Sequence, residues 1–150
     1  MFTKKERSGF KYWFAHWCAF NMTALNLRVW KPKYLFHDIE KPWLKLILRD
    51  YKKVQRIHRR NNRHHLQYKK PYDIDWEALA IDWECSRFTK TACPRTAREE
   101  MKTYRPELPE KTLFESDRDF NKRVEKYRSD MYKYKMMEAF LAPVLNKLGI

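Results

Sequence analysis

Glycine is almost absent from this chain of 150 residues, and its absence restricts the folds that the chain can adopt. The two glycines are Gly9 and Gly149, so residues 10–148 contain none. Phosphate-binding loops, dinucleotide-binding turns and nucleophile elbows all require glycine in the turn. Hairpin-rich β folds also draw on glycine for their tight turns. We therefore expect a fold built from helices.

The length and composition predict one globular unit. A chain of 150 residues can bury a sizeable core. Hydrophobic residues make up 43% of it and aromatic residues 16%, which argues against a disordered chain although 35% of the residues are charged. The sequence contains no run of about 18 apolar residues, so neither a membrane span nor a membrane partner is expected. The predicted fold class is an all-α, single-domain helical bundle.

The charge and the cysteines restrict the partners and the compartment. A formal net charge of +14 attracts polyanions such as nucleic acids, nucleotides and other phosphorylated molecules. A basic surface that serves solubility alone is the alternative interpretation. Cys18, Cys85 and Cys93 are odd in number and lack C-x-x-C spacing, which predicts reduced thiols in a cytoplasmic protein rather than a disulfide framework or a zinc knuckle.

Apolar residues recur at steps of three and four along several segments, which is the spacing of one helix face. A final long helix is expected to begin at Ser116, where "SDRD" resembles a capping box. We expect two parts: residues 1–112 form the main helical domain, and residues 113–150 form an amphipathic helix that packs on this domain or on a partner. The other predicted helices cover residues 8–30, 50–68, 76–90 and 96–103.

Prolines punctuate the region between the helices expected over residues 8–30 and 50–68, which holds the second predicted element. "KPK" at 31–33 is expected to end the first helix, and an apolar element follows it. Pro42 is expected to bend or divide that element just after the dipeptide His37-Asp38, unless it simply begins a new helix. Functional side chains are often exposed at such breaks.

The histidines are unevenly distributed. All five fall between positions 16 and 65, and none follows. His16 stands on the first predicted helix, His37-Asp38 on the second element, three histidines on the third helix and Asp82 on the fourth. The three histidines of the third helix are His58, His64 and His65. Helices packed in a bundle can turn such residues toward one centre, and imidazole nitrogen with carboxylate oxygen suits Zn, Mn, Fe or Ni.

Each of these residues also has a simpler interpretation. His16 lies on an aromatic stripe and can be a core histidine with satisfied hydrogen bonds. The three histidines of the third helix stand among arginines and can belong to a surface that faces nucleic acid, since residues 52–63 contain six Lys and Arg. Asp82 can be a solvated helix residue. The metal-centre hypothesis therefore depends on whether these residues meet in space.

The order His … His-Asp … Asp over separate helices resembles the HD superfamily of metal-dependent phosphohydrolases. In that superfamily an apolar run precedes "HD" and a Lys follows it, as in Leu35-Phe36-His37-Asp38-Ile39-Glu40-Lys41 here. The chain is most similar to a small, largely uncharacterised group of bacterial and phage proteins with "HDxSK" and "H…N-x-HH" segments. His58, Asn62, His64 and His65 match the second segment, and "AIDWE" at 80–84 falls where the group has an Asp-Trp helix. The resemblance covers about residues 10–103.

The resemblance implies an HD-domain-like fold, a divalent transition metal ion (Mn, Fe, Ni or Zn) and hydrolysis of a phosphate ester or nucleotide. It implies a protein of the bacterial cytoplasm, or of a phage-infected host cell. Asp38, Lys41 and His58 would be the catalytic residues. The ligands of the first metal would be His16, His37, Asp38 and Asp82. A second metal or the phosphate would be bound by His58, His64, His65, Arg60 and Arg63.

One departure from the pattern affects catalysis. Glu40 stands where the group prefers a small residue, and its carboxylate can join the site, crowd it or point away. Scaffolds of this kind can also persist without activity. The alternative function is therefore a non-catalytic, basic accessory factor that binds nucleic acid or protein, with aromatic side chains such as Trp30 and Tyr51 available to stack on bases.

Overall fold

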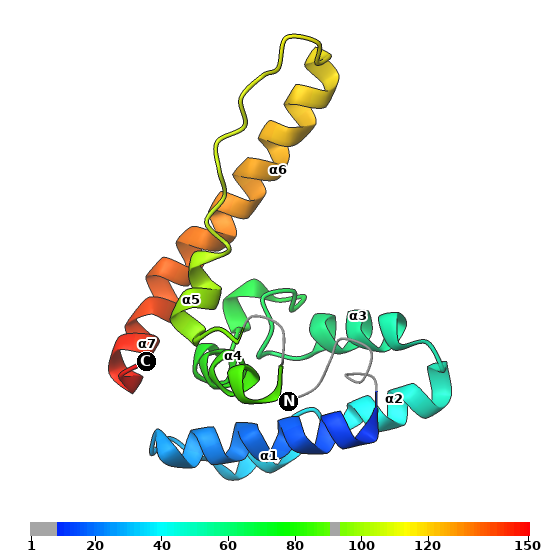
Figure 1. The fold of residues 1–150 in the computed structure, drawn as a ribbon, viewed down its shortest axis with the longest axis vertical. Coiled ribbons are helices and arrows are strands. Elements are labelled where there is room, and N and C mark those ends of the chain that lie inside the picture. The colour runs from blue at the N-terminus through cyan, green and yellow to red at the C-terminus, as the bar shows by residue number, and fades with distance from the viewer. Residues whose placement is uncertain (1–8, 91–93) are drawn as a thin grey trace.

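The computed structural model describes residues 9–90 and 94–150, and the chain is all-α (Figure 1). No β-strand occurs in these two ranges. None of the described helices is long and apolar enough to cross a membrane. The elements in chain order are α1 (Phe10–Asn26), η2 (Pro32–Phe36), α2 (Glu40–Leu48), α3 (Tyr51–Asn61), η3 (Pro71–Asp73), α4 (Trp76–Thr89), α5 (Ala97–Lys102), α6 (Asp117–Met136), η4 (Met137–Leu141) and α7 (Ala142–Leu148).

Side-chain caps fix the starts of four helices. The Asp50 carboxylate accepts hydrogen bonds from two backbone N–H groups at the start of α3, and Asp75 accepts one at the start of α4. Thr96 and Glu99 form a reciprocal capping box on α5. The Ser116 hydroxyl accepts from the backbone N–H of residue 119, which confirms the predicted start of the final helix. Such caps satisfy N–H groups that the first helical turn leaves without partners.

Two predicted helices are longer than the helices in the structure. The first was expected over residues 8–30, but α1 ends at Asn26, and position 8 lies outside the described residues. The third was expected over 50–68, but α3 ends at Asn61. Asn62 has an extended backbone, and its side-chain amide donates to the His58 carbonyl oxygen. An amide that competes for backbone groups in this way ends a helix although the apolar spacing continues.

The shorter α3 moves two candidate residues off the helix. His64 and His65 were predicted to stand on the third helix, and that prediction was wrong. Both lie in the turns between α3 and α4. The dipeptide His37-Asp38 lies in the break between η2 and α2, and Pro42 occupies the first turn of α2. These four candidate side chains are therefore carried by irregular backbone within a helical frame.

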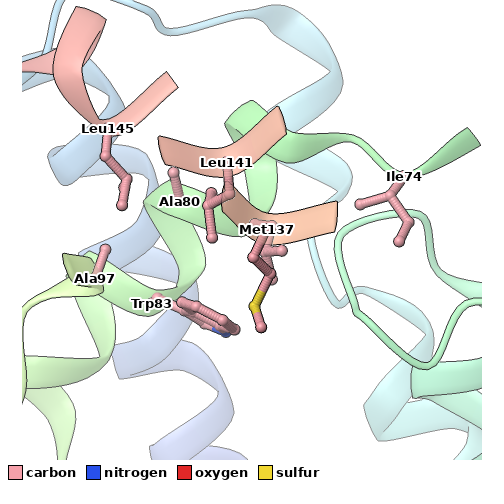
Figure 2. Close-up of a cluster of buried hydrophobic side chains, with 8 residues drawn as sticks. Ile74, Ala80, Trp83, Ala97, Met137, Leu141 and Leu145 are labelled. Carbon is pink, nitrogen blue, oxygen red and sulfur yellow. The ribbon is translucent and has the colours of Figure 1, made fainter. Parts of the chain in front are cut away.

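α4 is the centre of the fold, and its residues 78–86 are all buried. On one side it packs against α1 and Tyr34, and that core cluster consists of Phe20, Ala24, Tyr34, Ala78, Ile81 and Cys85. On the other side it packs against the C-terminal segment and α5 (Figure 2). The second cluster consists of Ile74, Leu79, Ala80, Trp83, Ala97, Met137, Leu141 and Leu145. Residues 137–148 therefore belong to the same core as the main domain.

α6 behaves differently from the segment that follows it. None of its 20 residues is buried. Figure 1 shows α6 projecting away from the other helices, with the chain that precedes it running back along its side. Arg123 ties the two together, because its guanidinium donates to the Glu110 carbonyl and pairs with the Glu115 carboxylate. The apolar stripe predicted for the final helix is therefore buried only in its last part.

Truncating Leu141 tests the second core cluster. Leu141 is fully buried in it, so Leu141→Ala is expected to lower the free energy of unfolding by about 2–5 kcal/mol, through lost burial and the cavity left behind. Urea unfolding followed by circular dichroism measures the change. Leu113→Ala, at an almost fully exposed position, is the control and is expected to change stability by less than about 0.5 kcal/mol. Equal effects of the two substitutions would contradict the packing described here.

Candidate metal centre

Four of the predicted ligands meet between α1, the break before α2, and α4. The His16 Nε2 atom lies 2.9 Å from Asp82 Oδ1 and 3.7 Å from Asp38 Oδ2. The His37 Nε2 atom lies 3.6 Å from each of the same two oxygens. All four side chains are buried. Residues separated by up to 66 positions in the sequence thus converge on one point.

The Nε2 atom of His37 makes no hydrogen bond within the described part of the chain, although two carboxylate oxygens lie 3.6 Å from it. Its ring stacks on Phe20, with ring centroids 3.6 Å apart. Its Nε2 atom is buried and has no hydrogen-bond partner among the described residues. Burial lowers the pKa of His37 to about 4, against the opposing attraction of Asp38. The imidazole is therefore neutral near pH 7, which is the form that binds a metal ion.

Asp38 is held in an uncommon conformation. Its backbone φ is +58°, in the left-handed region that non-glycine residues rarely adopt, although Asp and Asn tolerate it better than most. The Trp13 indole N–H donates to its carbonyl oxygen at 2.8 Å. Lys41, one helical turn ahead, pairs with its Oδ2 atom. Observed strain of this kind clusters at functional sites.

The carboxylate of Asp38 is ionised although only 1% of the residue's surface is exposed. Burial alone would raise its pKa, but the neighbouring His37 and Lys41, together with hydrogen bonds from His58 and His64, hold the pKa well below its usual range. Asp82 follows the same pattern: burial opposes ionisation, and His16 and His37 outweigh burial. Two buried carboxylates thus supply negative charge to the centre.

A second group of donors faces the other oxygen of Asp38. The Nε2 atoms of His58 and His64 lie 3.0 Å and 3.2 Å from Asp38 Oδ1. The His65 Nε2 atom lies 2.6 Å from His58 Nε2. Burial, together with the neighbouring His64, lowers the pKa of His65. Asp38 therefore stands between two sets of imidazoles, with one oxygen toward each set.

Glu40, the departure from the sequence pattern, has a definite place in this arrangement. Its Oε1 atom contacts the Nδ1 atom of His58, and the Asn62 amide donates to the same oxygen at 2.6 Å. Burial opposes ionisation of Glu40, but the contact with His58 lowers its pKa. A carboxylate on Nδ1 leaves the Nε2 lone pair of His58 facing the centre, as outer carboxylates do for metal-binding histidines. Glu40 thus orients a candidate ligand rather than crowding it.

Cys85 adds a donor that was not among the predicted ligands. It stands one turn after Asp82 on α4, and its thiol lies 3.8 Å from His16 Nδ1. Burial raises the pKa of this thiol. The spacing Asp82-x-x-Cys85 was the available signal, because residues three apart share a helix face. Cys18 and Cys85 are unpaired, as expected, and Cys93 lies outside the described residues.

The predicted basic residues divide into two kinds. Lys41 lies within the centre through its contact with Asp38. Arg60 and Arg63 are exposed on the surface, and the Arg63 Nε–H donates to the Asp73 carbonyl oxygen at 2.7 Å. The centre is therefore built from five histidines, Asp38, Asp82, Glu40 and Lys41, whereas both arginines are exposed.

The donor set fits a metal ion. In each of three overlapping groups, the candidate ligand atoms lie within 4.8 Å of one another. The groups are Asp38 with His58, His64 and His65; His16 with His37 and Asp38; and His16 with Asp82 and Cys85. Asp38 belongs to two of them. Two atoms that each lie about 2.1 Å from one ion are roughly 3.0–3.4 Å apart. The distances around His16 and His37 approach that range. These buried groups can hold a metal ion of the kind that prefers nitrogen and oxygen donors.

Comparisons of the chain with protein-family models, with curated proteins and with solved structures found no match. The resemblance to the HD superfamily therefore stays a prediction from the sequence motifs. What the structure adds is the spatial meeting of the residues that carry those motifs.

Metal addition is expected to stabilise the protein. Ligand at 100 times its Kd raises the free energy of unfolding by about 2.7 kcal/mol, or roughly 5–10 °C in Tm for a chain of this size. Differential scanning fluorimetry of chelator-treated protein with Mn, Fe, Ni or Zn measures the shift. Asp38→Asn is expected to abolish it, because Asn keeps the shape and tolerates the left-handed backbone but lacks the charge.

The matched control is Asp73→Asn, at an exposed carboxylate away from the centre. It is expected to retain the full shift in Tm. Metal analysis of purified protein provides a second readout. If no tested metal raises the Tm of the unmodified chain, or if Asp38→Asn responds as the unmodified chain does, the centre does not bind metal.

Proposed function

We propose that this chain is a metal-dependent phosphohydrolase-like protein that hydrolyses a phosphate ester, such as a nucleotide. The observation that carries the proposal is the position of Asp38, a buried carboxylate shared by two groups of candidate ligands. A carboxylate shared in this way suits a site with two adjacent metal ions, an arrangement used for displacement at phosphorus. The reduced thiols of Cys18 and Cys85 suit a cytoplasmic setting.

The bound metal would supply a water of lowered pKa and would polarise a phosphoryl oxygen. The residues of the chain have distinct roles around it. His16, His37, Asp38 and Asp82 would hold the first ion, and Asp38 with His58, His64 and His65 the second. Lys41 carries a positive charge that can stabilise negative charge as it develops on phosphoryl oxygens.

His58 is proposed to handle protons at the leaving group. Burial opposes its protonation, but Asp38 and Glu40 raise its pKa. An imidazole held by a carboxylate on Nδ1 keeps one orientation, and a general acid must have its proton aimed at the leaving oxygen. This role competes with metal binding by the same Nε2 atom. His58 would therefore act as a general acid only where His64 and His65 complete the second group without it.

A second candidate function, nucleic-acid binding, rests on the exposed basic side chains of α3 and of the turn that follows it. The side chains there are exposed, and six of them are basic: Lys52, Lys53, Arg56, Arg59, Arg60 and Arg63. Cations in such a cluster attract a phosphate backbone regardless of its sequence. These basic side chains are exposed, whereas the candidate metal ligands His58 and His64 are buried, so binding to nucleic acid and hydrolysis are compatible in one molecule.

Lys41→Met tests hydrolysis. The unmodified chain loaded with metal is expected to hydrolyse a phosphate monoester such as p-nitrophenyl phosphate, and the substitution is expected to lower kcat about 100-fold because one charge aimed at the phosphoryl group is lost. Release of nitrophenolate is measured by absorbance. Lys52→Met, on the exposed face of α3, is the control and should leave kcat unchanged. Absence of turnover of monoesters, diesters and nucleotides with every metal would refute the proposal.

Salt dependence tests nucleic-acid binding. Fluorescence anisotropy with a labelled single-stranded oligonucleotide is expected to give affinity at low salt and a linear fall of log K with log [salt]. The triple variant Lys52→Ala, Lys53→Ala, Arg56→Ala is expected to reduce the slope by about 2 if three phosphate contacts to a single strand are lost. No binding at low salt, or an unchanged slope in the variant, would remove this second function.

A further inference from the structure

A cavity of about 710 Å³ opens beside the candidate metal centre, between α1, α2 and α3. His16 and Asp38 are among its lining residues and are buried, whereas Phe10, Trp43 and Leu46 also line it and are exposed. The buried residues therefore form its floor and the exposed ones its rim. The volume falls in the range of pockets that hold small organic ligands. A ligand in this cavity would reach from solvent to Asp38.

The lining is mainly apolar and aromatic. Phe10, Trp13 and Trp43 contribute ring faces, and Leu46 and Val54 contribute aliphatic surface. The Trp13 ring is fixed in place, because its indole N–H is bonded to the Asp38 carbonyl. Fixed aromatic walls favour a flat, apolar guest, which can stack on them with little loss of conformational freedom.

The charged groups of the cavity favour a guest with negative charge. Tyr51 and Gln55 line it but bond to each other at 2.7 Å. Lys41, Lys45 and Arg49 supply three cations, and Asp38 supplies the one carboxylate among the described lining residues. A guest with many hydroxyl groups would find few partners for them and would lose its hydrogen bonds to water. A guest with one anionic end would be attracted toward Lys41.

The exposed rim supports the same conclusion. The second element is rich in apolar residues, yet α2 contains no buried residue. Trp43 is 66% exposed and Leu46 is 71% exposed. Large apolar groups that stay exposed around a concave site commonly mark where a ligand binds.

We propose that this cavity binds the flat, apolar part of the substrate, so that the substrate class is a phosphate ester of an aromatic alcohol. The ring lies against Trp43, Phe10 and Trp13, and the phosphate points toward Lys41 and Asp38. This inference rests on the proposed function for the fate of the phosphate, but the binding itself requires no turnover. According to this proposal, phosphate esters of small polyols are poor ligands of the cavity.

Binding of two non-hydrolysable phosphonates tests the proposal. Isothermal titration calorimetry on the metal-loaded chain is expected to give a Kd for 1-naphthylphosphonate at least tenfold lower than for methylphosphonate, because only the former reaches the aromatic walls. Trp43→Ala and Leu46→Ala are each expected to weaken naphthylphosphonate binding roughly three- to tenfold. Neither substitution should change the Kd for methylphosphonate.

Two matched controls stand on neighbouring positions. Phe36 is 67% exposed and Ile47 is 77% exposed, and neither lines the cavity. Phe36→Ala and Ile47→Ala are therefore expected to leave the Kd for naphthylphosphonate unchanged. Equal affinity for the two phosphonates, or equal loss in the cavity variants and the controls, overturns the proposal.

The outcome is separable from that of the hydrolysis assay. Tight naphthylphosphonate binding that Trp43→Ala weakens, without turnover of any ester, upholds the binding site and refutes the phosphohydrolase. Turnover of glycerol phosphate and 1-naphthyl phosphate with equal kcat/KM, unaffected by Trp43→Ala, upholds the phosphohydrolase and refutes the aromatic substrate class.

Discussion

The rest of this structure depends on one interaction, the pairing of the buried, ionised Asp38 carboxylate with the surrounding imidazoles and Lys41. A buried charge is costly unless it is paired and hydrogen-bonded. Here the cost is offset by groups from α1, the break before α2, α3 and the turns after it, and each of those elements is in turn positioned by the core on either side of α4. The left-handed backbone at Asp38 adds local strain that the Trp13 hydrogen bond helps to sustain. A fold that only needed stability would replace such a group with a hydrocarbon side chain.

This arrangement also explains the presence of Glu40. In a site with a small residue at that position, the Nδ1 atom of His58 would need another partner. Here Glu40 and Asn62 form a short polar chain that ends on His58. The Oε1 atom of Glu40 contacts both the Asn62 amide and the His58 imidazole, so the orientation of His58 depends on Glu40 and Asn62 together. Glu40 departs from the sequence motif, yet in the structure it holds the imidazole of His58 in place.

Part of this outcome was accessible from the sequence, because the signals involved were local or ordered along the chain. The helix starts at Asp50, Asp75 and Ser116 follow from capping chemistry. The meeting of His16, Asp38 and Asp82 was suggested by their order on successive helices. The end of α3 was not accessible, since it depends on a side-chain bond from Asn62 that the apolar spacing does not encode. The exposure of α2 was not accessible for a related reason: the apolar residues of a helix do not show by themselves what covers them.

The burial of α4 on all sides has a consequence for the history of such a chain. Residues 78–86 contribute to two cores and to the candidate metal centre within nine consecutive positions. A substitution there disturbs packing on one side or the ligands on the other, whichever way the side chain points. Among descendants of a common ancestor, this segment should therefore diverge most slowly. None of the residues of the projecting α6 is buried, so its sequence is free to diverge fastest. Related chains should therefore differ in α6 before they differ in residues 78–86.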